Sequence, residues 1–304
     1  MKYVIGVDGG GTKTEASAYS SKGEVILTSK RGFANLLNNR ETALNNIVNS
    51  IKEIIDILGT SELKGVYLGI AGSEVGENAK IISDKIKNKL KIDAVVMNDA
   101  EIALKAMLKG KDGILVIAGT GSVAFGINNN ISSKCGGWGN LLGDEGSGYS
   151  IAIKAIKRMI FEEEHSIPKS ELTRQIMSKL QINSVNEITK FVYSSTKDEI
   201  AALTPIVARL GEAGDKAACE ILINEGIELA KTVENLYRKL KFEGCPIALV
   251  GGVIKKAEIL RRVFEDYLKE NIVIKDIIDE EVSPTIGAYY INKIEEEKID
   301  TNCD

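Results

Sequence analysis

The chain has 304 residues, and 44% of them are hydrophobic, which is enough to bury the core of one large domain or two modest ones. It carries 39 Lys and Arg residues against 43 Asp and Glu residues, and the two signs are interspersed along the chain. This balance argues against a nucleic-acid-binding surface and against a membrane-binding face, so we expect neither partner.

The amino-terminal segment and the cysteines indicate the cellular compartment in which we expect the protein. Residues 1–8 lack the basic, apolar and small-residue regions of a secretory signal, and the longest apolar runs are too short to cross a bilayer. The four cysteines lie far apart without CxxC spacing, which argues against a structural zinc site and a disulfide framework. They are Cys135, Cys219, Cys245 and Cys303. We expect reduced thiols in a cytoplasmic protein.

The first part of the chain predicts three strands and then alternating helices and strands. The expected strands are residues 3–7, 14–19, 24–29, 65–71 and 93–97, and the expected helices are 41–58, 77–90 and 99–109. From Gly113 the same order begins again, with strands at 114–118 and 123–127 and a third strand toward Cys135.

The second part adds a long helical region at 147–240 before strand 247–250, helix 255–268, strand 272–275 and a last helix from about residue 284. Because the pattern restarts near Lys111, we expect two α/β domains. The N-terminal domain comprises residues 1–112, and the C-terminal domain comprises residues 113–304 with the helical insertion.

A glycine-rich turn, Asp8-Gly9-Gly10-Gly11-Thr12-Lys13, joins the first two expected strands. Glycines let the backbone approach a bulky anion and adopt positive φ, and free amides can bind phosphate oxygens. Dinucleotide and P-loop fingerprints place their glycines at a helix start, whereas residues 14–19 predict a strand. Taken alone, the turn leaves a tight hairpin as the alternative.

Two further glycine turns lie at equivalent strand ends, Gly119-Thr120-Gly121-Ser122 and Gly251-Gly252, so we expect one cleft. Five ordered motifs resemble the N-acetylglucosamine and N-acetylmuramic acid kinase branch of the BadF-type ATPases, within the actin, hexokinase and heat-shock-chaperone superfamily. They are DGGGTKT, NDAE, AGTGS, GGWGNLLGDEGSGY and VGGV. The similarity spans residues 6–288 and is diffuse over 150–243.

This resemblance implies two ribonuclease-H-like, actin-like ATPase domains with ATP in an interdomain cleft. Asp8 would orient Mg²⁺ through water, with a turn-capping acid as the alternative. The residues implied to hold the nucleotide are Gly10, Gly11, Thr12, Lys13, Gly119, Thr120, Gly121, Ser122, Gly251, Gly252 and, in the adenine pocket, Gly211.

Asp99 is the candidate catalytic residue. Phosphorylating a sugar hydroxyl requires positioning, charge neutralisation and an acceptor for the hydroxyl proton. Asp99 follows a strand and begins a helix, which the spacing alone explains equally well as an N-cap. The resemblance places the family's catalytic base in this Asn98-Asp99 segment.

Glycines beside the single tryptophan suggest a backbone pressed against a ligand, although Trp138 could also be a core residue. Asp144 and Asn35 match sugar-binding residues of the family, and Ser73 falls near a family serine in a different local motif. The resemblance thus implies a sugar site of Asn35, Ser73, Asn98, Asp99, Trp138, Gly139 and Asp144.

We therefore expect ATP-dependent 6-phosphorylation of N-acetylglucosamine or N-acetylmuramic acid. The family resemblance also implies a homodimer. Glucosamine and glucose remain alternative substrates. Another alternative is a BadF-type ATPase that activates a partner enzyme through an iron-sulfur cluster, although such proteins carry cysteine near the second phosphate turn and residues 117–122 contain none. A non-catalytic sugar sensor is a third.

Overall fold

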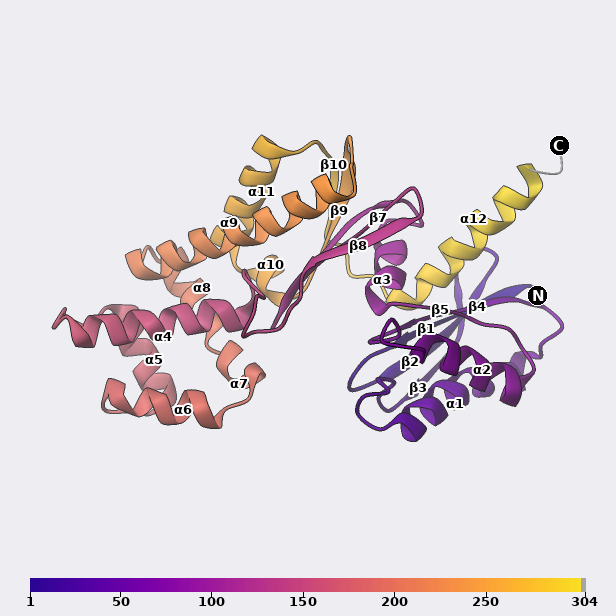
Figure 1. The fold of residues 1–304 in the computed structure, drawn as a ribbon, viewed down its shortest axis with the longest axis horizontal. Helices are drawn as coiled ribbons and strands as arrows, with labels where there is room; N and C mark the ends of the chain where they lie inside the picture. The colour runs from indigo at the N-terminus through magenta and orange to yellow at the C-terminus, as the bar shows by residue number, and fades with distance from the viewer. Residues whose placement is uncertain (302–304) are drawn as a thin grey trace. The chain divides into compact units, whose positions relative to one another are not determined.

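The computed structural model describes residues 1–301. The chain forms two compact units, each built around a five-stranded mixed sheet (Figure 1). Unit 1 contains Met1–Gly113 together with the segment that begins at Glu280, and unit 2 contains Ile114–Asp279. The predicted α/β fold with two domains is confirmed.

The sheet of unit 1 has the strand order β3-β2-β1-β4-β5. Its strands are β1 (Tyr3–Gly9), β2 (Thr14–Ser20), β3 (Val25–Arg31), β4 (Leu63–Ile70) and β5 (Val95–Met97). β1, β4 and β5 are parallel, and β1 pairs antiparallel with β2 so that Asp8 lies opposite Glu15. The carboxyl ends of three parallel strands therefore meet at one edge of the sheet.

Helices cover both faces of this sheet. α1 (Arg40–Leu58) and α2 (Asn78–Leu90) lie on one face, and α3 (Asp99–Met107) and α12 (Gly287–Thr301) lie on the other (Figure 1). α1 turns apolar side chains at helical spacing into the core, including the fully buried Ile47, Ile51 and Ile54. Asn39 caps its start by accepting a hydrogen bond from the Thr42 amide.

The last helix corrects the predicted domain division, because residues from 280 onward belong to unit 1 rather than to a C-terminal domain of 113–304. The short helix η2 (Pro284–Ile286) packs on β1 where Gly6 has no side chain. The Tyr19 and Thr285 hydroxyls hydrogen-bond at 2.7 Å, and Tyr67 donates to Glu295 at 2.5 Å. The repeating pattern placed this helix with its neighbours in sequence and could not show which sheet it covers.

The sheet of unit 2 has the order β10-β9-β6-β7-β8. Its strands are β6 (Gly113–Ala118), β7 (Ser122–Asn128), β8 (Ile131–Gly136), β9 (Cys245–Val250) and β10 (Ile274–Ile278). β6, β9 and β10 are parallel, whereas β7 and β8 are antiparallel. The glycine turns at Gly119 and Gly251 therefore follow the carboxyl ends of neighbouring strands.

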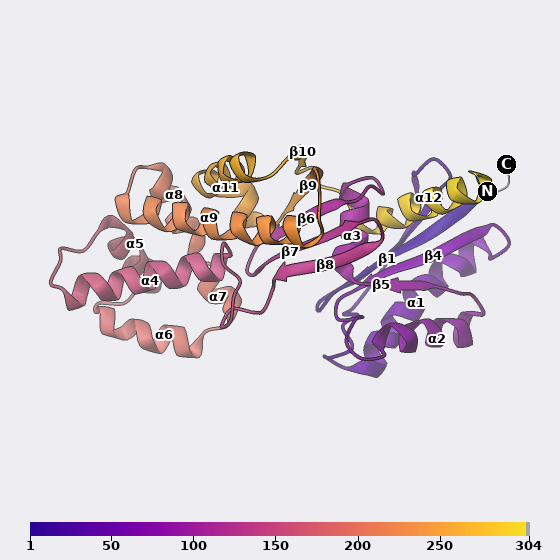
Figure 2. The ribbon, with the colours of Figure 1, turned by 45° about the horizontal axis from the view of Figure 1, so that its top comes forward.

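The helices of unit 2 fill the region that was predicted only as a long helical stretch. α9 (Lys216–Lys239) packs on β7 and β8 and against α8 (Thr204–Glu212) and α11 (Glu258–Asn271) (Figure 2). The expected helix at 255–268 is divided at Ala257 into α10 and α11. The helical elements are α4 (Gly148–Glu164), α5 (Glu171–Leu180), η1 (Val185–Glu187), α6 (Ile188–Ser194), α7 (Lys197–Ala201), α8 (Thr204–Glu212), α9 (Lys216–Lys239), α10 (Gly252–Lys256) and α11 (Glu258–Asn271).

The structure agrees with the sequence on the state of the cysteines and on the lack of long apolar helices among residues 1–301. Cys135, Cys219 and Cys245 are free thiols on three different elements, and Cys303 lies outside the described residues. Among residues 1–301, the structure contains no helix with the length and apolar character needed to cross a membrane.

We expect Gly6→Ala to lower the free energy of unfolding by about 1–3 kcal/mol, because overpacking displaces the neighbouring backbone. A Cβ at Gly6 would lie 1.9 Å from the Thr285 carbonyl oxygen. Gly11→Ala is the matched control, since a Cβ there would meet nothing within 4 Å. Urea unfolding of both variants tests this. Equal stability of Gly6→Ala and the wild-type protein would contradict the packing of η2 on β1.

Candidate active site

The glycine turn of unit 1 is closed by its own backbone and is open on its outer side. The Gly10 amide donates to the Lys13 carbonyl at 3.0 Å, and the Gly10 carbonyl accepts from the Ala34 and Asn35 amides at 2.9 and 3.2 Å. A Cβ on Gly10 or Gly11 would meet nothing within 4 Å. The turn thus leaves space for a ligand beside exposed residues Thr12 and Lys13.

The expectation of positive φ in this turn is wrong, because Gly9, Gly10 and Gly11 are not among the residues with positive φ. Close packing explains the first of them. A Cβ at Gly9 would lie 2.5 Å from the Ala34 Cβ and 2.7 Å from the Ile70 Cδ1. The glycines therefore serve close approach of the backbone rather than left-handed conformation.

Asp8 lies near the end of β1 in a crowded acidic environment. Burial is the main reason that its pKa is raised to about 6; the positive charge of Lys13 lowers the pKa, and the Asp99 and Glu15 carboxylates raise it. Asp8 pairs in register with Gly69, and a Cβ on Gly69 would lie 3.2 Å from the Asp99 Cα, so the two acids lie close together. The structure thus brings together the two acids that the sequence selects in this unit.

Asn98, rather than Asp99, is the N-cap of α3. The Asn98 Oδ1 accepts from the Ala100 amide at 2.8 Å, and its Nδ2 donates to Glu74 at 2.8 Å. Asp99 is the first helical residue, and one of its carboxylate oxygens lies 3.0 Å from the same Ala100 amide. The side-chain amide of Asn98 is therefore engaged at both ends, which orients the start of α3 and the Asp99 backbone.

Asn35 and Ser73 lie at the same edge of unit 1. The Asn35 Oδ1 accepts from the Leu37 amide at 2.9 Å and is 3.8 Å from where a Cβ on Gly72 would lie. Ser73 is only 3% exposed and donates its hydroxyl hydrogen to the Met97 carbonyl at 2.8 Å. Ser73 thus ties the loop after β4 to the end of β5, immediately before Asn98.

The glycine turn of unit 2 is bound to the segment that follows β8. The Gly119 amide donates to the Gly121 carbonyl at 2.9 Å, and the Gly148 amide donates to the Gly119 carbonyl at 2.7 Å. The buried Ser122 donates its hydroxyl hydrogen to the Glu145 carbonyl at 2.7 Å. Ser122 therefore holds the loop, while Gly119, Thr120 and Gly121 remain partly exposed.

Asp144 lies directly against this turn. A Cβ on Gly121 would be 2.8 Å from the Asp144 Oδ2. The Asp144 side chain accepts from the Gly139 amide at 3.2 Å and forms an ion pair with Lys197 at 3.6 Å. Its φ of 63° is unusual for a residue with a side chain, and such strain is concentrated at functional sites.

Glu225 anchors the loop just beyond Asp144. It is fully buried on α9, accepts from the Gly146 amide at 2.6 Å and forms an ion pair with Lys154. A Cβ on Gly146 would lie 2.6 Å from the Leu229 Cβ, so α9 and the loop are in close contact. Sequence reasoning missed Glu225, although an acid among the apolar positions of α9 was a usable signal.

Trp138 lies on the surface, so the alternative of a core tryptophan is wrong. Its side chain is 70% exposed, and Leu141 and Leu142 in the same loop are 87% and 81% exposed. Gly139 between them has a φ of 87°, which favours glycine. Unit 2 therefore presents an apolar loop next to Asp144.

A cavity of about 610 Å³ opens in unit 2 beside the glycine turn and includes Gly119, Thr120 and Gly252 in its wall. Gly251 does not line the cavity but packs against β6, since a Cβ on Gly251 would be 2.3 Å from the Ala118 carbonyl oxygen. Most of the wall was not predicted, because it comes from the diffusely similar helical region and from α10. These further lining residues include Asp198, Thr204, Pro205, Ala208, Arg209, Glu212, Val253 and Lys256.

Gly211 is not in the wall of this cavity. It is buried in α8, where a Cβ would lie 2.6 Å from Leu222 and 3.3 Å from Ile259. Its carbonyl accepts a hydrogen bond from the Cys219 thiol at 3.2 Å. The same helix contributes Ala208, Arg209 and Glu212 to the cavity, and a place for Gly211 in an adenine pocket stays a prediction.

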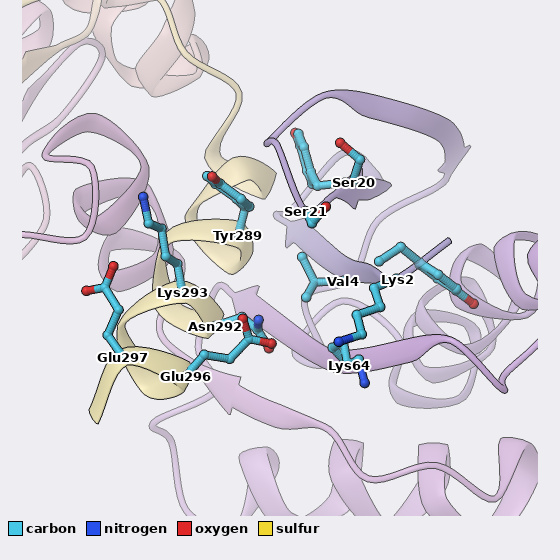
Figure 3. A pocket seen from close by; sticks show the side chains of 12 residues that line it. Lys2, Val4, Ser20, Ser21, Lys64, Tyr289, Asn292, Lys293, Glu296 and Glu297 are labelled. Atoms are coloured by element: carbon cyan, nitrogen blue, oxygen red, sulfur yellow. The ribbon is translucent and has the colours of Figure 1, made fainter. Parts of the chain in front are cut away.

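A second cavity, of about 750 Å³, lies in unit 1 at the amino-terminal end of β1 (Figure 3). Lys2 and Lys64 line it from the sheet, and Asn292, Lys293 and Glu296 line it from α12. The expected phosphate and sugar residues of unit 1 are instead at the carboxyl end of β1. This cavity is therefore separate from the candidate site.

Comparison with known proteins gives consistent results. The BadF/BadG/BcrA/BcrD ATPase family model matches residues 5–291. An N-acetylmuramic acid/N-acetylglucosamine kinase of Clostridium acetobutylicum is 34% identical and covers 97% of this chain and 99% of its own length. An N-acetyl-D-glucosamine kinase of Dictyostelium discoideum is 28% identical over 93% of this chain and 95% of its own.

A solved structure has the same fold. It is that of a candidate N-acetylglucosamine kinase from Chromobacterium violaceum, with a TM-score of 0.68 and 20% sequence identity. The similarity covers 96% of this chain and 99% of that chain.

We expect Asp8→Asn to raise the free energy of unfolding at pH 7.5 by about 1–3 kcal/mol, because the native fold disfavours the charged carboxylate. A pKa of about 6 in the fold against an ordinary 3.8 means that the folded protein binds more protons between these values. Wild-type stability should therefore fall as the pH rises through this range, and the variant should lack this loss.

Urea unfolding of Asp8→Asn and the wild-type protein at pH 4.5 and pH 7.5 measures the effect. We expect a larger difference between the two proteins at pH 7.5 than at pH 4.5. A variant that is less stable than the wild type at pH 7.5 would contradict the unfavourable placement of the Asp8 charge.

Proposed function

We propose that this chain, which belongs to the BadF/BadG/BcrA/BcrD ATPase family, transfers the γ-phosphate of ATP to the 6-hydroxyl of N-acetylglucosamine or N-acetylmuramic acid. The names of its Clostridium and Dictyostelium relatives support an amino sugar as acceptor. The observation that carries the proposal is the placement of Asp8 and Asp99 side by side at the carboxyl edge of unit 1, beside an open glycine turn.

The nucleotide is assigned to the glycine turns and to the cavity of unit 2. A cavity of about 610 Å³ is in the range for small-molecule sites. The apolar wall residues Pro205, Ala208 and Val253 suit a purine base. The amides at Thr120 and Gly121 in unit 2, and at Gly11 to Lys13 in unit 1, bind phosphate oxygens, while the bond of the Gly10 amide to the Lys13 carbonyl shapes the turn.

Asp8 suits a site for Mg²⁺ because its carboxylate is partly exposed near the end of β1, beside the glycine turn and close to Asp99. Mg²⁺ keeps several waters and uses few protein carboxylates, so Asp8 would hold it directly or through water. When bound, the ion supplies positive charge that offsets the phosphate charge.

Asp99 performs the proton transfer. Its carboxylate accepts the hydrogen of the sugar 6-hydroxyl as the sugar oxygen forms a bond to the γ-phosphorus. The bond between that phosphorus and the bridging oxygen of ADP breaks, and ADP leaves with the electron pair. Asn98 and Ser73 position Asp99 by fixing the start of α3 and the end of β5.

The sugar is assigned to Asn35, Asp144 and Trp138. Asn35 and Asp144 also have protein partners, but their oxygens have further lone pairs that can accept from sugar hydroxyls. The exposed Trp138 ring beside Gly139 offers an apolar face to the sugar ring. Asn98 and Ser73 are engaged with protein partners, so we assign them to positioning rather than to sugar contact.

An ADP-release assay across N-acetylglucosamine, N-acetylmuramic acid, glucosamine and glucose tests the substrate assignment. We expect the two N-acetylated sugars to have the highest kcat/KM. Turnover of glucose or glucosamine alone would overturn the assignment of an N-acetylated amino sugar in favour of those substrates. We further propose a cytoplasmic homodimer that salvages cell-wall sugars, on the basis of the family resemblance.

We expect Asp99→Asn to lower kcat about 10²- to 10⁴-fold while the sugar still binds, because the amide cannot accept the hydroxyl proton. Glu77→Gln is the control, since Glu77 is an exposed acid without a side-chain cap bond at the start of α2. Steady-state kinetics with calorimetric sugar binding makes the comparison. Near-normal turnover of Asp99→Asn with intact sugar binding would exclude Asp99 as the base.

A further inference from the structure

We infer that Lys197 is a phosphate-binding residue, whose ammonium group contacts the β- or γ-phosphate of the nucleotide at the Thr120-Gly121 turn of unit 2. This inference rests on the proposed function, because it assumes a nucleotide in the neighbouring cavity. The sequence motifs do not include Lys197, which lies in the diffusely similar region between residues 150 and 243.

The position of the Lys197 ammonium is the first observation. A Cβ on Gly121 would lie 3.3 Å from the Lys197 Nζ and 2.8 Å from the Asp144 Oδ2. Lys197 and Asp144 therefore both reach the outer surface of the glycine turn. The next residue along the chain, Asp198, lines the cavity together with Gly119 and Thr120.

The accessibility of the ammonium group is the second observation. The Lys197 side chain is 41% exposed, whereas that of its ion-pair partner Asp144 is 5% exposed. The Nζ to Oδ2 distance of 3.6 Å is long for a charge-assisted hydrogen bond. Lys197 thus retains donor capacity toward a ligand, because an ammonium group has three donors.

The backbone at Lys197 is fixed by a capping box at the start of α7. The Thr196 hydroxyl accepts from the Glu199 amide at 3.3 Å, and Glu199 accepts from the Thr196 amide at 2.6 Å. The long side chain therefore extends from a defined point toward the turn.

Electrostatics supplies the third argument. A phosphate at the turn would lie beside the Asp144 carboxylate, and two negative groups at such a distance repel each other. A cation that contacts both groups removes this repulsion. Lys197 already forms an ion pair with Asp144 at the turn, so its ammonium group can contact the phosphate as well without a change in the backbone.

The test compares ligands that differ only in phosphate number. Calorimetry gives the Kd of adenosine, AMP, ADP and ATP for the wild type, Lys197→Ala and Lys197→Arg. Lys190→Ala is the matched control, because Lys190 is an exposed lysine of the preceding helix α6. We expect Lys197→Ala to weaken ADP or ATP about 10- to 100-fold, as expected for a lost hydrogen bond to a charged group.

We expect adenosine and AMP to bind Lys197→Ala within about threefold of the wild type, and Lys197→Arg to recover most of the lost ADP and ATP affinity. Equal weakening of all four ligands would show that Lys197 only supports Asp144, and unchanged ADP and ATP affinity would exclude phosphate contact. Either result overturns the inference. A wild-type protein that binds none of the four ligands would instead overturn the proposed function.

Discussion

The burial of the Asp8 carboxyl beside Asp99 at the carboxyl edge of unit 1 is the constraint on which the candidate site depends. Parallel pairing of β1, β4 and β5 brings the ends of these strands together, and Asp8 and Asp99 follow from that register. A fold that buries a carboxyl group near other acids lowers its own free energy of unfolding, which is common at functional sites. The arrangement is understandable if a cation completes the site, because its positive charge then offsets the negative charges of the acids and of a bound phosphate group.

Both units hold their functional loops with buried polar contacts. In unit 1, Ser73 joins the loop after β4 to β5, and Asn98 caps α3. In unit 2, Ser122 donates to the Glu145 carbonyl and Glu225 accepts from the Gly146 amide, so both bind the same peptide group. These side chains are oriented by protein groups and not toward a ligand, so their role is to fix the geometry of neighbouring residues. The contacts explain why a site built from loops can be rigid.

Much of this architecture could be predicted from the sequence, because strand periodicity, glycine turns and caps are local signals. The sequence could not predict which domain contains the last helix, because Thr285 just before it packs on Gly6 and Tyr19, which are far away in the chain. The residues of α8 that line the cavity could not be predicted for the same reason, since the side of α8 that carries Gly211 is buried against Leu222 and Ile259. An ion pair such as Asp144 with Lys197 has no local pattern at all.

The most direct test of this account is the identity of the product formed from N-acetylglucosamine, ATP and Mg²⁺. Two-dimensional ¹H–³¹P NMR of the reaction mixture shows which carbon carries the new phosphate. The account predicts coupling of the phosphorus to the two protons on carbon 6, with ADP formed in equal amount. Phosphate on another carbon, or release of inorganic phosphate with unchanged sugar, would contradict it.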